Sequence, residues 1–127
     1  MEQLRLLIVD DEEDFASVLA QRLEFRGFQV ETAGSGSDAL ARVAAKAFHV
    51  LVLDVKMPGI DGLDLMAQIR AKHACLPVIL LTGHGSAAGA DRGMKEGAFD
   101  YLMKPVDIDE LIEKIRKAAG TGKVEPA

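Results

Sequence analysis

Short apolar segments recur along the chain, and each is followed by a longer segment whose apolar residues repeat at helical spacing. Residues 6–9, 50–53 and 76–81 are apolar runs of strand length. Runs of this kind are typical of strands buried on both faces of a parallel sheet. Residues 28–33 alternate between polar and apolar, which indicates a more exposed strand, and residues 98–103 form a fifth strand.

A helix is predicted after each strand, because apolar side chains recur three and four residues apart. These apolar faces are Phe15, Val18, Leu19 and Leu23; Ala39, Leu40, Val43 and Ala44; Leu63, Leu65, Met66 and Ile69; Ala87, Ala90 and Met94; and Ile108, Leu111, Ile112 and Ile115. The fourth helix, expected over 86–97, contains Gly89 and Gly93, each of which costs about 1 kcal/mol relative to alanine. Local propensity therefore predicts that this helix is mobile.

Five strands alternating with five helices predict one α/β domain built on a parallel sheet. A chain of 127 residues is long enough to bury a sizeable core. We expect residues 1–119 to form the domain and residues 120–127, which contain Gly, Thr and Pro, to be a flexible tail.

The formal net charge of −5 argues against a nucleic-acid or anionic-membrane surface, because both require clustered Lys and Arg. The single cysteine, Cys75, excludes an intramolecular disulfide and fits a reducing cytoplasm. We expect its side chain to be buried or half-buried. The first residues do not form a signal peptide, and no apolar run approaches the length of a membrane span, so a cytoplasmic domain is predicted.

Polar residues capable of chemistry lie where four of the five strands end. They are Asp10 and Asp11, Asp54, Thr82, and Lys104. The carboxyl ends of parallel strands share one edge of the sheet, where open α/β sheets bind their ligands. If the strand order is 2-1-3-4-5, the first and third strands are neighbours, and Asp11 and Asp54 come close together.

Three carboxylates in one crevice need a counter-charge, and Mg²⁺ with oxygen ligands supplies it. The Thr82 hydroxyl and the Lys104 ammonium suit the oxygens of a phosphoryl group, with Asp54 as the candidate nucleophile that forms an acyl phosphate. Alone, Asp54 is explained equally well as the cap of a turn. The acidic run at 10–14 also suits a helix start, although this explains Glu12 to Asp14 better than the two residues at the strand end.

Four motifs together resemble the receiver domain of two-component response regulators over residues 4–119. They are Val9-Asp10-Asp11-Glu12, Leu53-Asp54-Val55-Lys56-Met57-Pro58-Gly59-Ile60-Asp61-Gly62, Leu81-Thr82-Gly83-His84-Gly85 and Gly97-Ala98-Phe99-Asp100-Tyr101-Leu102-Met103-Lys104-Pro105. The resemblance implies a doubly wound, flavodoxin-like α/β fold, similar to that of chemotaxis regulators, with five parallel strands in the order 2-1-3-4-5 and five helices.

The resemblance also implies a role for each acidic residue. Asp54 is expected to be the phosphoacceptor. Asp11 and Asp54 are expected to bind Mg²⁺ directly, together with the backbone carbonyl of Lys56, while Asp10 acts largely through water.

Thr82 and Tyr101 are expected to form a switch pair, in which the hydroxyl moves toward the phosphate and the ring turns inward behind it. Lys104 is expected to contact the phosphate, and its peptide bond to Pro105 is expected to be cis. The output surface of the family surrounds the fourth helix, fifth strand and fifth helix.

The predicted function is a phosphorylation-controlled signalling switch. Its donor is the phosphohistidine of a histidine kinase or phosphotransfer protein, and it catalyses only its own phosphorylation and dephosphorylation. One alternative is a Mg²⁺-dependent phosphatase with an aspartyl-phosphate intermediate, but such enzymes place a second acid two residues after the nucleophile, where this chain has Lys56. The other is a degenerate receiver that acts as a constitutive binding module.

The sequence leaves two forms of output open: a stand-alone regulator that docks on a protein partner, and the receiver of a longer protein with an attached output domain. Phosphorylation-dependent dimerisation is compatible with either. Among the remaining polar residues, His84 could modulate acyl-phosphate hydrolysis, although an exposed loop histidine is the simpler interpretation. His49 and His73 lack partners at metal-binding spacing, and Asp61 and Asp64 suit the turn and cap of the third helix.

Overall fold

A parallel five-stranded sheet forms the centre of the computed structural model, which describes residues 3–57, 60–83 and 87–124. Its strands are β1 (Arg5–Val9), β2 (Gln29–Ala33), β3 (Val50–Asp54), β6 (Val78–Thr82) and β7 (Asp100–Met103). They lie in the order β2-β1-β3-β6-β7. This is the doubly wound order 2-1-3-4-5, and it confirms the predicted fold class.

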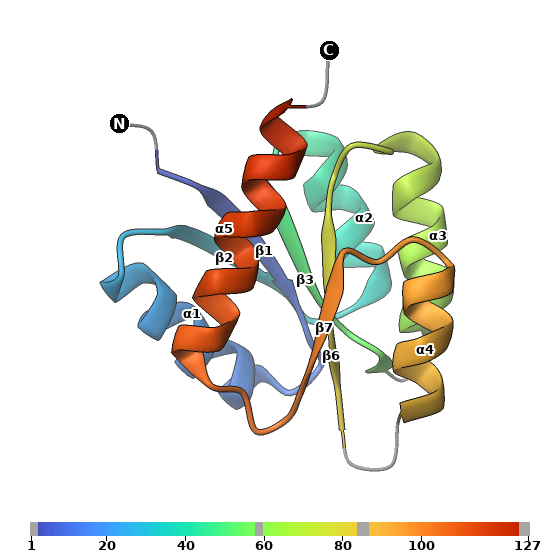
Figure 1. The fold of residues 1–127 in the computed structure, drawn as a ribbon, viewed down its shortest axis with the longest axis horizontal. Coiled ribbons are helices and arrows are strands. Elements are labelled where there is room, and N and C mark those ends of the chain that lie inside the picture. The colour runs from blue at the N-terminus through green and yellow to red at the C-terminus, as the bar shows by residue number, and fades with distance from the viewer. Residues whose placement is uncertain (1–2, 58–59, 84–86, 125–127) are drawn as a thin grey trace.

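Helices cover both faces of the sheet (Figure 1). On one face lie α1 (Glu13–Phe25) and α5 (Ile108–Val124); on the other lie α2 (Gly36–Ala45), α3 (Gly62–Lys72) and α4 (Ala87–Lys95). Successive strand residues point to opposite faces, so Leu6 and Ile8 belong to the core under α1 and α5, while Leu7 and Val9 belong to the core under α2 and α3. Burial on both faces explains why β1 and β3 read as uninterrupted apolar runs.

Helix boundaries follow local capping chemistry. The Ser35 side chain accepts a hydrogen bond from the Asp38 backbone N–H and caps α2, and the Asp61 side chain accepts one from the Leu63 N–H at 2.7 Å and caps α3. Gly27 follows the end of α1 with a φ of 100°, a left-handed conformation that glycine adopts without strain. The cap expected from Asp61 is therefore present.

Gly93 in α4 has a packing role that helix propensity does not reveal. It is buried, and a Cβ at this position would collide with the Leu80 side chain of β6 and lie 3.2 Å from Cδ2 of Leu63. The missing side chain therefore lets α4 lie close to the sheet. The mobility predicted for α4 from its glycines stays a prediction.

Two details differ from the expectations. Two-residue strands β4 (Lys56–Met57) and β5 (Ile60–Asp61) pair in an antiparallel arrangement, in addition to the five expected strands. Cys75 is exposed rather than buried, because it lies in the turn between α3 and β6.

Helix α5 continues to Val124. The domain boundary at residue 119 and the flexible tail over 120–127 stay predictions. None of the described helices combines the length and apolar content needed to cross a bilayer.

Candidate functional site

Three carboxylates meet at the carboxyl ends of β1 and β3. Asp10, Asp11 and Asp54 each place one oxygen so that the three atoms lie within 4.8 Å of one another. The parallel pairing of β1 with β3, in which Val9 lies opposite Leu53, brings the two strand ends together. Asp10 and Asp54 are only 1% and 6% exposed, whereas Asp11 faces solvent. The juxtaposition expected from a 2-1-3 strand order is therefore present.

Lys104, which follows β7, reaches across the sheet edge into this acidic group. Its Nζ donates to Oδ2 of Asp10 at 3.0 Å and to Oε1 of Glu12 at 3.2 Å, and it lies 3.8 Å from Oδ1 of Asp54. The peptide bond between Lys104 and Pro105 is cis, as the resemblance implied. The lysine thus supplies one positive charge among several negative ones.

These contacts shift two pKa values in the same direction for different reasons. Burial raises the pKa of Asp54 from 3.8 to about 6, and repulsion by Asp10 adds to this effect, while the positive charge of Lys104 opposes it. Burial opposes the charge on Lys104, but its hydrogen bond to Asp10 and its attraction to Asp10 and Asp54 prevail and raise the pKa of the ammonium group. Asp54 is therefore held in an environment that disfavours its negative charge until a further cation or proton is present.

Phe15 and Glu12 are site residues that the sequence analysis assigned only to a helix face and a helix start. The Lys104 Nζ lies 4.4 Å from the centroid of the Phe15 ring, and Glu12 accepts one of its hydrogen bonds. Both residues are far from Lys104 in the sequence; Glu12 and Lys104, for example, are 92 residues apart. No local spacing in the sequence therefore predicts these contacts. The ring face and the carboxylate together orient the ammonium group.

Replacing Phe15 with leucine is expected to lower the free energy of unfolding by about 1–2 kcal/mol, because leucine keeps most of the apolar contact but lacks the π face under Lys104. Urea denaturation measures the change. Phe25→Leu is the matched control on the same helix, since Phe25 is 89% exposed and should tolerate leucine. Equal effects of the two substitutions would contradict a special role for the Phe15 ring.

Thr82 and Tyr101, the expected switch pair, differ in exposure. Thr82 is fully buried at the end of β6, and its hydroxyl donates to Sδ of Met103 at 3.1 Å. The Tyr101 side chain on β7 is 36% exposed. The tyrosine is therefore partly exposed to solvent, while the threonine hydroxyl is bound to a methionine sulfur inside the protein.

The loop after Asp54 is anchored by backbone contacts. The Lys56 N–H approaches Oδ1 of Asp54 at 3.4 Å, and the Gly62 N–H donates to the Val55 carbonyl at 2.8 Å. A Cβ on Gly62 would lie 2.6 Å from the carbonyl oxygen and 2.8 Å from the Cα of Val55, and would also overlap the Asp54 carbonyl oxygen. Only glycine therefore fits where α3 starts against the strand end that carries Asp54. His84 lies outside the described residues.

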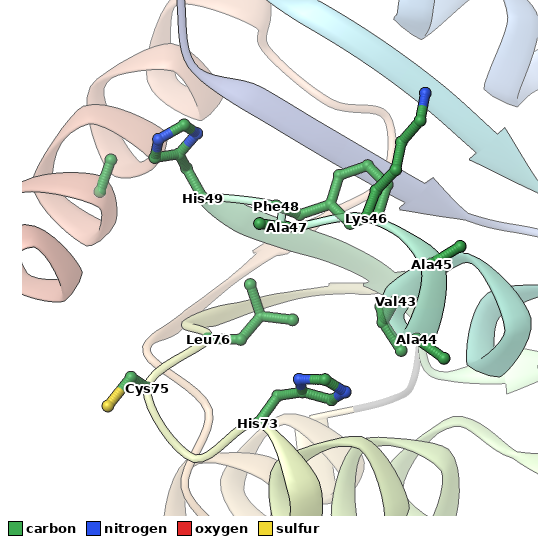
Figure 2. A pocket seen from close by; sticks show the side chains of 11 residues that line it. Val43, Ala44, Ala45, Lys46, Ala47, Phe48, His49, His73, Cys75 and Leu76 are labelled. Atoms are coloured by element: carbon green, nitrogen blue, oxygen red, sulfur yellow. The ribbon is translucent and has the colours of Figure 1, made fainter. Parts of the chain in front are cut away.

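A cavity of about 580 Å³ lies at the opposite, amino-terminal edge of the sheet. Figure 2 shows its lining from the end of α2, the segment before β3 and the turn before β6, with His49, His73 and Cys75 among the labelled side chains. Nδ1 of His49 accepts a hydrogen bond from the Arg5 backbone N–H at 2.9 Å, a structural role. Among the residues that the structure describes, only the three aspartates form a group able to hold a metal ion, so we place the chemistry at the carboxyl edge.

A doubly wound sheet with three carboxylates, a threonine and a lysine at its carboxyl edge defines a receiver-type signalling domain. The family model for the response regulator receiver domain matches residues 6–116. The chain therefore belongs to the response regulator receiver domain family.

Curated relatives agree with this assignment. The chain is 41% identical over 111 residues to the DNA-binding transcriptional regulator NtrC of Salmonella typhimurium, a match that covers 87% of this chain and 24% of the relative. It is 36% identical over 121 residues to the transcriptional regulatory protein TcrA of Mycobacterium tuberculosis, covering 95% of this chain and 48% of the relative. The chain thus spans about a quarter to a half of the length of these regulators.

Solved structures share the fold. A response regulator receiver domain protein from Clostridium thermocellum superimposes with a TM-score of 0.91 at 35% identity, covering 95% of this chain and 98% of the other. NtrX from Brucella abortus in complex with ADP gives a TM-score of 0.92 at 34% identity, covering 97% of this chain and 28% of the other. Neighbours are thus found both as receiver domains alone and as parts of longer chains.

Proposed function

We propose that this chain is a phosphoacceptor receiver of a two-component phosphorelay and that Asp54 carries the phosphoryl group. The observation that supports this most is the grouping of Asp10, Asp11 and Asp54 within 4.8 Å, with the Lys104 ammonium 3.8 Å from the Asp54 carboxylate. The Asp54 carboxylate serves as the nucleophile, the neighbouring carboxylates supply ligands for a cation, and the lysine supplies a positive charge. The family assignment agrees with this use of the site.

In the proposed reaction, a carboxylate oxygen of Asp54 attacks the phosphorus atom of a phosphohistidine. A P–O bond forms, the P–N bond breaks, and the imidazole leaves with its electron pair, so that Asp54 becomes an acyl phosphate. Lys104 and the Thr82 hydroxyl then donate hydrogen bonds to phosphoryl oxygens. The same residues support slow hydrolysis, and the domain transforms no separate substrate.

The donor set fits a hard divalent cation such as Mg²⁺, because all three grouped side chains are carboxylates. We propose that Asp11 and Asp54 hold the ion directly with the Lys56 backbone carbonyl, and that Asp10 acts largely through water. The bound ion supplies charge neutralisation for the transferring phosphoryl group. The pKa of Asp54, raised to about 6, is consistent with a carboxylate that lacks a full counter-charge without the ion.

Output is proposed to pass through α4, β7 and α5, with Thr82 and Tyr101 as the switch pair. A cytoplasmic histidine kinase or phosphotransfer protein is the proposed donor. The proposed target is a docking protein, an output domain attached to the same polypeptide, or a second phosphorylated copy of the chain. The exposed Tyr101, Met103 and Met94 side chains offer apolar contacts on this surface.

Incubation with acetyl phosphate and Mg²⁺ is expected to add one phosphoryl group, detected by intact-mass spectrometry, because the small donor replaces phosphohistidine. Omission of Mg²⁺ should lower the rate at least about tenfold, since charge neutralisation is lost. Asp54→Asn should abolish the modification. Asp64→Asn, an exposed carboxylate on α3, is the control that should react like the wild type.

Two results would contradict this proposal. A wild type that gains no phosphoryl group with Mg²⁺ present would leave the degenerate binding module as the better description. An Asp54→Asn variant phosphorylated as fast as the wild type would place the acceptor elsewhere.

A further inference from the structure

The buried hydroxyl of Thr82 has a specific partner outside the acidic group. Its Oγ1 lies 3.1 Å from Sδ of Met103, to which it donates its proton. Thr82 and Met103 are register partners in the parallel pair β6–β7, so the two backbones hold the side chains side by side. Thr82 is 0% exposed, and a hydroxyl at such a position needs a partner inside the protein.

A threonine hydroxyl has one proton, so it cannot donate fully to the methionine sulfur and to a phosphoryl oxygen at once. We propose that Met103 is a positioning residue that holds the Thr82 hydroxyl away from the phosphoryl site in the resting protein. This inference rests on the proposed phosphorylation of Asp54. On activation, the Thr82 hydroxyl then changes its hydrogen-bond acceptor from the Met103 sulfur to a phosphoryl oxygen.

The Met103 thioether is a suitable acceptor for a hydrogen bond that has to break on activation. A neutral sulfur is a weak acceptor, whereas an anionic phosphoryl oxygen forms a much stronger, charge-assisted hydrogen bond. Met103 is 40% exposed and lies on the same face of β7 as Tyr101, two residues earlier. The methionine can therefore move toward solvent without breaking a tightly packed core.

Replacing Met103 with leucine removes the acceptor while keeping a side chain of similar volume. In the variant, the resting state loses its hydrogen bond, but the phosphoryl-loaded state loses nothing. The apparent affinity for beryllofluoride in the presence of Mg²⁺ should therefore rise about three- to tenfold. The affinity is read from the fluorescence of Tyr101, which is a specific reporter because the chain has one tyrosine and no tryptophan.

Two comparisons separate positioning from a general packing effect. Phe25→Leu is the control, since Phe25 is an exposed apolar side chain on α1, outside the proposed output surface, and it should leave the affinity unchanged. In a Thr82→Val background, which has no hydroxyl, Met103→Leu should also change nothing. An effect of Met103→Leu that persists in that background would overturn the inference, and so would a Met103→Leu variant with wild-type affinity.

If Asp54 is not the phosphorylation site, the experiment gives a different result from the one that contradicts the role of Met103 alone. In that case the wild type and Asp54→Asn would respond identically to Mg²⁺ and beryllofluoride, and the inference would fall with the phosphorylation site. A wild type that responds through Asp54 while Met103→Leu matches it would remove the inference alone.

Discussion

In buffer without divalent cations, Asp54→Asn is expected to increase the free energy of unfolding by about 2–3 kcal/mol more at pH 8 than at pH 4. The cause is the pKa of Asp54, which burial raises from 3.8 to about 6 in the folded protein, with repulsion from Asp10 adding to the effect. The folded state disfavours the carboxylate, and asparagine never carries that charge.

The direction follows from proton binding. Between pH 4 and pH 6 the folded protein holds the Asp54 proton more tightly than the unfolded chain does, so the wild type loses stability as the pH rises through this interval. Below about pH 3 both states are protonated and the penalty is absent. The asparagine variant lacks this loss, and its advantage should therefore appear as the pH rises and level off above pH 7.

Urea denaturation at pH 4 and pH 8 measures this difference. Asp91→Asn is the control, since Asp91 is exposed on α4 and its replacement should change the unfolding free energy by less than about 0.5 kcal/mol at either pH. An Asp54→Asn variant whose advantage is the same at both pH values would show that the carboxylate is not disfavoured in the fold.

Gly62→Ala is expected to lower the free energy of unfolding by about 3 kcal/mol and to weaken the acidic site. The new Cβ would lie 2.6 Å from the carbonyl oxygen and 2.8 Å from the Cα of Val55, and would overlap the Asp54 carbonyl oxygen. These are backbone atoms that cannot rotate away, so either α3 or the end of β3 has to shift. A shift of the end of β3 would move Asp54 itself.

Gly34→Ala provides the comparison for Gly62→Ala. A Cβ on Gly34 would meet nothing within 4 Å, so this substitution should change the unfolding free energy by less than about 0.5 kcal/mol. Thermal or urea unfolding measures stability, and phosphorylation by acetyl phosphate reports on the site. A Gly62→Ala variant as stable as Gly34→Ala would show that the contact with the strand end is easily relieved.

The sequence predicted the fold because its strong signals are local. An apolar run such as 50–53 that ends in a carboxylate identifies both a buried strand and the residue at its end, and the parallel sheet places all such ends on one edge. Asp10, Asp11 and Asp54 were therefore predicted to meet, and they do. The strand order itself came from the resemblance rather than from the pattern.

The contacts that local patterns could not predict depend on tertiary structure. Phe15 occupies one apolar position on a helix, and its place beneath the Lys104 ammonium depends on how the start of α1 and the residue after β7 meet in the folded protein. By helix propensity Gly93 destabilises α4, whereas in the structure a Cβ at this position would collide with the Leu80 side chain, so the close packing of α4 on the sheet requires glycine. Met103 reads as an ordinary strand residue until the register with Thr82 is known.

Lys104 gives the acidic edge a resident counter-ion. Its ammonium already contacts Asp10 and Glu12 and lies near Asp54. Under the proposed function, a divalent cation would meet carboxylates whose charge is already partly neutralised, so it would gain less from binding than at an acidic edge without the lysine. We therefore expect the proposed ion site to have a moderate affinity and to fill according to the ion concentration of the surroundings.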